Sequence, residues 1–355
     1  MAKVEVQQPL SDQGLDSLMS TELFAHIEKT FGQALPLATL IEAPTIKQLA
    51  GVLASVLSQE VKTAVSSVSW SSLVEIQPGD SKPPLFFIHA EEGNVLFYRD
   101  LAHRLGIDQP FYGLQARGLN GEQVDDYRIE DMAAHYIKEI QSVQPHGPYF
   151  LGGFCLGGAI AYEMSQQLQA DNDEVALLVM IQNYHRDYKV YQSNGSSLPP
   201  IAYRLIDRVD YELSKLKNQD LKGKLSYISK RIQRAIAIVD FNVTKRLDQN
   251  LAKYHLSVPH SQSYNFDFVA DRNKDAFLNY EPRMYNGHVI IFRASKQPRG
   301  IKFEPTLGWG KLIQGEVELY EIDAYHQTIM ENPQVEPLAD ILKKSLNKEL
   351  DSDSS

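Results

Sequence analysis

The stretch that decides the fold is Gly152-Gly153-Phe154-Cys155-Leu156-Gly157-Gly158. It follows the apolar run Tyr149 to Leu151 and precedes a helix-like run from Ala159 to Leu168. A strand that turns between small residues into a helix is the setting in which a G-x-S-x-G motif holds a nucleophile on a strained turn. The central residue here is Cys155, although a lone cysteine is more often a small buried hydrophobe. If it is a nucleophile, the first N–H groups of the helix should face whatever it attacks.

The composition is that of a globular protein. The 355-residue chain is 43% hydrophobic and 10% aromatic, which is enough for a sizeable core. Its formal net charge of −10 argues against nucleic acid or an anionic membrane surface as a partner. We see no membrane-length apolar stretch and no secretory leader, and therefore expect a cytoplasmic protein. The single cysteine excludes an internal disulfide and argues against a structural zinc site, so no metal is predicted.

The first sixty residues have the pattern of a small helical domain. Asp16 is suited to cap a helix whose first turn contains Ser17, and apolar residues then recur at helical spacing up to Phe31. A second helix is expected from Pro44-Thr45, because proline suits the first helical position and an apolar face follows.

This part resembles a carrier domain of polyketide and non-ribosomal peptide synthases. The matching stretches are Gly14-Leu15-Asp16-Ser17-Leu18-Met19, Phe31-Gly32, and Ala43-Pro44-Thr45-Ile46-Lys47-Gln48-Leu49-Ala50. The resemblance implies that Ser17 carries 4′-phosphopantetheine, with a phosphopantetheinyl transferase as partner; the alternative is that Ser17 only caps a helix. A phosphodiester there would meet the unpaired N–H groups of the helix N-terminus. Because sixteen residues are too few for the usual first helix, we expect a partial all-α carrier domain over residues 1–60.

Strand and helix patterns alternate in the rest of the chain. Residues 61–71 predict a linker, and a first strand follows near Ser72 to Ile76. The apolar run that starts at Leu85 indicates a strand buried on both faces. Further patterns then alternate between helix and strand, at Tyr98 to Leu105, Phe111 to Leu114, Ile129 to Val143, the run into Cys155, and Val175 to Ile181. This order predicts an α/β fold with a parallel sheet.

Residues 72–347 resemble a type I thioesterase, the chain-releasing domain of the same synthases, within the α/β-hydrolase class. The matching stretches are the His89 loop with Gly93-Asn94, Tyr112 to Leu119, the Cys155 elbow, Tyr285 to Val289, Leu307-Gly308-Trp309, and His326 ahead of Glu331-Asn332-Pro333. The resemblance implies a helical lid at about 185–271. The lid carries many basic residues, which form either a solvated face or a docking surface for an acidic carrier. We expect the tail, 348–355, to be disordered.

The same resemblance implies the catalytic residues. Cys155 is the nucleophile and His326 the base that takes its proton, in the order that this class uses. The family has an Asp after the next strand, and Gln182 stands at that position in this chain. An amide oxygen can fix an imidazole tautomer but cannot stabilise an imidazolium as a carboxylate does. Asn183 and Asp187 are the alternatives.

The loop after the His89 strand is expected to complete the site. The backbone N–H groups of Ala90 and Leu156 would form the oxyanion hole. Glu91 and Glu92 follow Ala90, where the family commonly has small residues. Two carboxylates near a developing oxyanion would oppose it, unless they point away as solvated charges or one of them holds a cationic acceptor amine.

The sequence therefore predicts a chain-releasing thioesterase that works with upstream synthase modules or carrier domains. An acyl chain would move from a phosphopantetheine thioester to Cys155 and leave by hydrolysis, cyclisation or transfer to an amine. Two alternatives are a catalytically inactive hydrolase fold that binds acyl chains or docks partners, and an editing thioesterase that clears misprimed carriers.

Overall fold

The fold was analysed in a computed structural model, which describes residues 5–10, 13, 15, 17–32, 35, 39–57, 71–119, 122, 124, 127–185, 191–192, 212, 262–297, 301–302 and 304–352. The chain divides into two compact units, one of residues 1–188, 261–295 and 305–355 and one of residues 189–260 and 296–304. In the second unit, β6 (Tyr191–Gln192) pairs with β8 (Ile301–Lys302) in antiparallel fashion. Nearly all of the predicted linker and most of the predicted lid lie outside the described residues.

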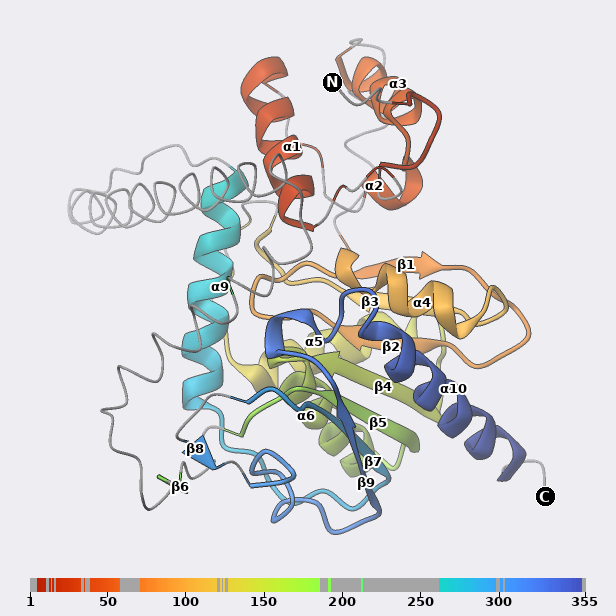
Figure 1. The fold of residues 1–355 in the computed structure, drawn as a ribbon, viewed down its shortest axis with the longest axis vertical. Helices are drawn as coiled ribbons and strands as arrows, with labels where there is room; N and C mark the ends of the chain where they lie inside the picture. Colours follow the sequence, from red (N-terminus) through yellow and green to blue (C-terminus); the bar gives the residue numbers. More distant parts are fainter. Residues whose placement is uncertain are drawn as a thin grey trace. The chain divides into compact units, whose positions relative to one another are not determined.

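The first unit is built on a seven-stranded sheet in the order β1-β3-β2-β4-β5-β7-β9 (Figure 1). Its strands are β1 (Leu73–Gln77), β2 (Leu85–Ile88), β3 (Phe111–Leu114), β4 (Tyr149–Phe154), β5 (Val175–Ile181), β7 (Val289–Ala294) and β9 (Val317–Ile322). Only the β1–β3 pair is antiparallel, and the other neighbours are parallel. The predicted α/β class with a parallel sheet is therefore confirmed, and each strand expected from the sequence is present within a residue or two.

Helices cover both faces of this sheet. They are α4 (Arg99–Leu105), α5 (Ile129–Gln141), α6 (Leu156–Ala170), α9 (Gln262–Asn279) and α10 (Val335–Ser352), with short 3₁₀ turns η3 (Leu96–Tyr98) and η5 (His326–Thr328). Alternate residues of β2, β4 and β5 enter two separate cores, one shared with α5 and α6 and the other with α4 and α10. Because successive strand residues face opposite sides, a strand covered on both faces must be apolar throughout, as Leu85 to Ile88 are.

The end of the chain differs from the expectation. Residues from 348 onward were expected to be disordered, but α10 continues to Ser352. Leu346 is buried in the core, and Glu349 lies 2.8 Å from the Nδ1 atom of His288. These contacts hold the last turns of the helix against the sheet. The described helices include none that is long and apolar enough to cross a membrane.

The N-terminal part forms a small helical core. Its helices are α1 (Ser17–Phe31), α2 (Thr39–Glu42) and α3 (Ile46–Leu57), packed around six buried residues: Phe24, Ile27, Leu35, Leu40, Leu49 and Leu53. The described residues before Ser17 form no helix. Instead they bond to the start of α3, with Leu10 N–H on the Pro44 carbonyl (2.8 Å) and Lys47 N–H on the Val6 carbonyl (3.1 Å).

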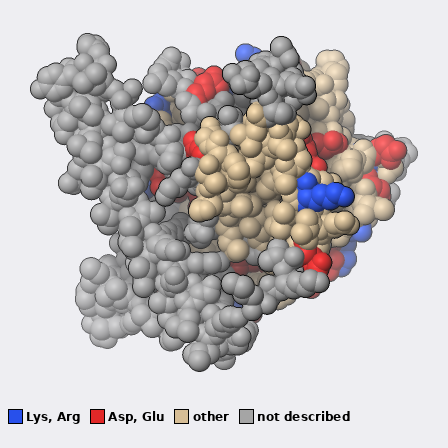
Figure 2. All heavy atoms as spheres, turned by 90° about the horizontal axis from the view of Figure 1, so that it is seen from above, with Lys and Arg blue, Asp and Glu red and all other residues tan. Residues whose placement is uncertain are grey.

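Figure 2 shows one face of the molecule, on which the described surface carries separate acidic and basic side chains around a largely uncharged area.

Candidate active site

The centre of the candidate site is the turn between β4 and α6, which holds Cys155 with φ 52° and ψ −123°. Positive φ is strained for a residue other than glycine, and such strain persists only where the surroundings enforce it. Here Cys155 N–H donates to the Ile181 carbonyl (2.9 Å), and the Asn183 side-chain amide donates to the Cys155 carbonyl. A Cβ atom at Gly153 would collide with the backbone of Gly157. The two glycines therefore permit the close crossing that the sequence predicts.

Cys155 is a half-buried residue, and its thiol is un-ionised at neutral pH. Burial of its surroundings raises the pKa of Cys155 to about 12; the Leu156 N–H, which hydrogen-bonds to the sulfur, opposes this rise, and the charges of Glu91 and Glu92 add to it. The N–H of Leu156 thus points toward the Cys155 sulfur, as expected of an oxyanion-hole donor. At neutral pH Cys155 is a thiol, and it would need a base to take its proton before it could act as a nucleophile.

His326 lies beside this turn, at the start of η5 after strand β9. Its ring contacts the ring of Phe154, the residue before Cys155, at 5.2 Å between centroids, and stacks on Tyr184 at 6.0 Å. Burial lowers the pKa of His326 to about 4, so the imidazole is neutral at pH 7. Its Nδ1 atom is buried and has no hydrogen-bond partner among the described residues. His326, the residue predicted to act as base, is therefore a neutral imidazole packed against the residue before Cys155.

Gln182 is fully buried at the end of β5, but its amide is used elsewhere. Its oxygen accepts from the Ala294 N–H (2.6 Å), and its NH₂ group donates to the Tyr184 hydroxyl (2.5 Å). The β5–β7 pairing directs the side chain toward the end of β7, and this is the physical reason that the expected contact with His326 is not formed. Gln182 instead supports Tyr184, on which the His326 ring stacks.

Asn183, one of the two alternatives to Gln182, also makes no hydrogen bond to His326. Asn183 donates to the Cys155 carbonyl, and its Oδ1 atom is buried without a partner. Asp187 lies outside the described residues.

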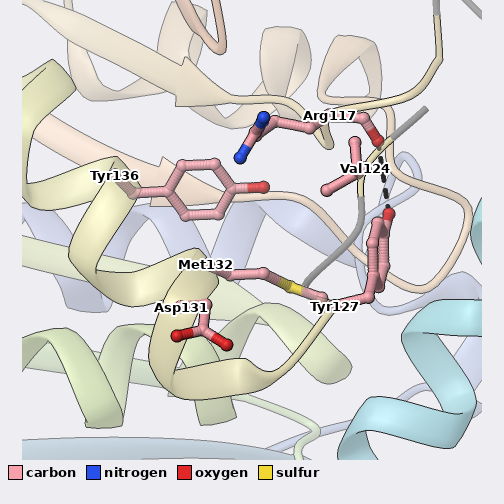
Figure 3. A pocket seen from close by; sticks show the side chains of 6 residues that line it. All are labelled: Arg117, Val124, Tyr127, Asp131, Met132 and Tyr136. Carbon is pink, nitrogen blue, oxygen red and sulfur yellow. Dashed lines mark hydrogen bonds between the residues drawn. The ribbon is translucent and has the colours of Figure 1, made fainter. Parts of the chain in front are cut away.

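The loop after β2 is fixed by His89, which is fully buried. One ring nitrogen, Nδ1, lies 2.7 Å from the Ala90 carbonyl, and the other, Nε2, lies 2.8 Å from the Tyr136 hydroxyl. A carbonyl only accepts, so Nδ1 carries the hydrogen and Nε2 accepts from tyrosine. Burial lowers the pKa of His89 to about 4, which keeps this arrangement neutral. Figure 3 shows Tyr136 and Arg117 pointing toward one another across a small cavity beside this bond.

Strand register brings the two predicted oxyanion donors to one end of the sheet. Ile88 of β2 pairs with Gly153 of β4. Two residues further on, the chain reaches Ala90 in the loop after β2 and Cys155 in the turn after β4. A Cβ atom at Gly157 would meet the His89 carbonyl oxygen at 2.7 Å, which shows how closely this loop approaches the first turn of α6. Ala90 and Leu156 therefore occupy adjoining backbone segments.

Tyr98 is a site residue that sequence reasoning missed. It is fully buried, and its hydroxyl donates to the Ile88 carbonyl (2.7 Å) and accepts from the Phe154 N–H (2.7 Å). It therefore joins the ends of β2 and β4 directly before the nucleophile. Its sequence context, a helical run after a glycine, gave no sign of this role.

Ser17 is the first residue of α1, a helix of 15 residues. The N-terminal end of a helix favours a phosphate, because the first N–H groups of a helix have no partners within it. The backbone at this position thus suits a phosphopantetheine attachment.

A separate group of polar side chains lies between strands β7 and β9 and helix α10. His288 contacts Glu318 (3.1 Å) and Glu349 (2.8 Å) through its two nitrogens, and Lys348 lies 3.7 Å from Glu318. His288, Glu316 and Glu318 have the residue types of a metal site. Both nitrogens of His288 already face carboxylates, however, and these contacts connect α10 to the sheet. This role explains the group without a metal ion.

Comparisons with known proteins agree with this fold. The "Thioesterase domain" family matches residues 83–346, and the "Phosphopantetheine attachment site" family matches residues 2–53. This chain belongs to the thioesterase domain family, preceded by a phosphopantetheine-binding carrier domain as in non-ribosomal peptide and polyketide synthases. The predicted fold and the predicted cofactor are thereby confirmed.

This chain spans only a small part of the length of the synthases that it matches. The dimodular nonribosomal peptide synthase of Bacillus subtilis (strain 168) is 30% identical over 346 residues, which cover 97% of this chain but 13% of the relative. A holo four-domain nonribosomal peptide synthetase, bound to AMP and glycine, superimposes with a TM-score of 0.58 at 24% identity, covering 97% of this chain and 25% of that one. The NocB thioesterase domain, in covalent complex with a fluorophosphonate nocardicin G analogue, gives 0.50 at 18% identity, covering 77% and 99%. The last two likenesses support the fold alone.

Proposed function

We propose that this chain releases acyl chains from a synthase by forming an acyl-enzyme on Cys155. The observation that carries the proposal is the strained turn that presents Cys155 next to the Leu156 N–H, with the neutral His326 ring packed on the preceding residue. This is the arrangement of a nucleophile, an oxyanion donor and a base that acyl transfer requires. Upstream synthase modules and carrier domains are the proposed partners.

The protonation states define how the step proceeds. The pKa of Cys155 lies at about 12 and that of His326 at about 4, so no thiolate–imidazolium pair exists beforehand. His326 therefore removes the thiol proton as the sulfur attacks the substrate thioester, and then passes that proton to the leaving thiol. The N–H groups of Ala90 and Leu156 stabilise the oxyanion. In the second half-reaction His326 acts as base for water, for a nucleophile within the acyl chain, or for an amine.

Ser17 is the proposed attachment point for 4′-phosphopantetheine, with a phosphopantetheinyl transferase as the enzyme that loads it. The start of α1 suits the phosphate of this group. When attached, the group presents an acyl chain as a thioester. The domain boundaries at residues 60, 71 and 347 remain predictions.

Intact-protein mass spectrometry after incubation with short acyl-thioester mimics tests the proposal. We expect an acyl increment on the wild type, none on Cys155→Ala, and slow labelling of His326→Ala. If no mimic labels Cys155 while a generic alkylating agent still does, the catalytic proposal is wrong and a non-catalytic acyl-binding or docking module takes its place. The unpartnered Nδ1 of His326 is the observation that favours this second function. An editing role would appear as preferential hydrolysis of the shortest acyl groups.

A further inference from the structure

The oxyanion loop carries two carboxylates that no described ion pair neutralises, although the charge of Lys274 acts on Glu91. Glu91 is half-buried and Glu92 is exposed, and neither forms an ion pair with a described residue. The strand register that places Ala90 beside the elbow places these two carboxylates there as well. Both charges act on the Cys155 thiol, which is an independent sign that they lie close to it. An anion forming at this site would be opposed unless a cation is also present.

Two buried acceptors are associated with the same loop. Asn273 of α9 is 0% exposed, and its NH₂ group donates to the Glu91 carbonyl (2.8 Å). Because a carbonyl only accepts, this bond fixes the orientation of the amide and leaves Oδ1 free. That oxygen is buried without a partner among the described residues, and so is the Oδ1 atom of Asn94. Buried polar atoms are rarely left unpaired, so acceptors without donors indicate a ligand that donates.

The carboxylates and unpaired acceptors of the loop indicate which kind of ligand would bind there. Acceptors and carboxylates with no donor of their own call for a compact cation that carries several N–H groups. A primary ammonium has a positive charge and three donors, which matches both requirements. Solvated loop charges would account for Glu92, but not for a fully buried Asn273 aimed at the loop.

We propose that the Glu91–Glu92 loop, together with Asn94 and Asn273, binds the ammonium form of a primary amine, which then attacks the acyl group on Cys155. This inference rests on the proposed function and specifies its acceptor. The amine belongs either to a separate molecule or to the far end of the acyl chain. In the first case the product is a linear amide, and in the second it is a cyclic one.

The step balances as follows. The ammonium gives one proton to the Glu91 carboxylate, whose pKa is raised by burial and then by Glu92, with Asp271 adding to the rise and Lys274 opposing it. The free amine forms a C–N bond to the acyl carbon while the bond from that carbon to the Cys155 sulfur breaks. His326 takes the second proton from the nitrogen and passes it to the departing sulfur. The amide and the free thiol are the products.

The experiment measures how a preformed acyl-enzyme divides between attack by an added amine and hydrolysis by water. Wild type and Glu91→Gln are acylated with a hexanoyl thioester mimic and then given butylamine, which is protonated at pH 8, or hydroxylamine, which is neutral there. We expect the ratio of butylamide to hexanoic acid to fall at least about tenfold in Glu91→Gln because butylamide formation slows, whereas hydrolysis and the hydroxylamine reaction, which need no cation site, should not slow. Glu174→Gln is the matched control, because exposed Glu174 precedes β5 at the opposite end of the sheet from the elbow.

Equal loss for both nucleophiles, or no loss for butylamine, would overturn the inference while leaving the acyl-enzyme intact. A 6-aminohexanoyl mimic distinguishes the two sources, since a cyclic product identifies an amine within the acyl chain. If no variant is acylated, the proposed function fails instead, and butylammonium binding to Cys155→Ala then tests the cation site alone. That binding should weaken at least about tenfold when Glu91→Gln is added, and unchanged binding would refute the site.

Discussion

Alkylation of Cys155 tests whether the nucleophile and its base are both neutral. The chain has one cysteine, so the mass increment from iodoacetamide reports on this residue alone. Only the thiolate reacts, and the pKa of Cys155 is raised to about 12. We therefore expect the rate in the folded protein to rise about tenfold per pH unit from roughly pH 6 to pH 10, without a plateau.

The expected rate can be estimated from ionisation and nucleophilicity. At pH 7.5 a thiol with a pKa of about 12 is ionised to roughly 3 parts in 100,000, against about one part in ten for an ordinary cysteine. A more basic thiolate is also more nucleophilic. With a Brønsted slope of about 0.45, the raised pKa makes the thiolate roughly 40-fold more reactive, which offsets part of the loss from weaker ionisation. The folded protein should thus react about a hundredfold more slowly than the same chain unfolded in urea.

The assay compares the folded chain, the unfolded chain and His326→Ala over this pH range. His326→Ala should keep the same pH slope, because the imidazole is uncharged and does not hold a thiolate in place. A rate that is independent of pH between about 6 and 9, as an imidazolium–thiolate pair would give, would refute the reasoning. So would a folded protein that reacts as fast as the unfolded one.

Three further predictions concern the supports of the site. The pKa of His89 is about 4 in the folded chain, below its usual 6.5. The residue therefore has no effect on stability above pH 6.5, but it lowers the free energy of unfolding by about 2 kcal/mol at pH 5, where only the unfolded chain is protonated at this position. His326, whose pKa is also about 4, titrates in both proteins, so urea unfolding should show about 2 kcal/mol more loss in wild type than in His89→Gln. Parallel pH curves would contradict this. Gly157→Ala would push a methyl group against the carbonyls of Ile88, at the end of β2, and of His89, which should lower the free energy of unfolding by about 2 kcal/mol. The control Gly51→Ala meets open space in α3 and should be neutral or stabilising by up to about 1 kcal/mol. Tyr98→Phe leaves the Phe154 N–H and the Ile88 carbonyl without a partner, for a cost of about 1–3 kcal/mol; unchanged hydrogen exchange at the Phe154 amide would argue against that role.

Much of the fold could be predicted because its signals are local. The run Leu85 to Ile88 is apolar throughout because both of its faces are covered, and length and flanking residues identify it as a strand. The small residues around Cys155 are required by the close crossing of β4 and α6, so the elbow could be predicted from the sequence. The short helix α2 has four residues, too few to produce a periodic pattern, and it was missed.

The supports of the site could not be predicted, because they depend on distant pairings. The Tyr136–His89 bond joins residues 47 positions apart, and the Tyr98–Phe154 bond joins residues 56 apart. No pattern along the chain indicates which buried tyrosine reaches which backbone group. Likewise, position 182 could be aligned from its place after β5, but the direction of its side chain is set by Ala294 on a strand more than a hundred residues later.

The bonds of Gln182 limit how the site can be re-engineered. Its amide oxygen is bound to the end of β7, and its NH₂ group to the hydroxyl of Tyr184. A carboxylate introduced by Gln182→Glu would meet the same two neighbours, and the Tyr184 hydroxyl would have to turn and donate to it. The His326 ring would gain no direct partner from that change. Restoring a serine-type triad therefore requires Cys155→Ser, an acid at another position and a new support for β7 together, so the cysteine and its surroundings form one interdependent set that single substitutions cannot convert.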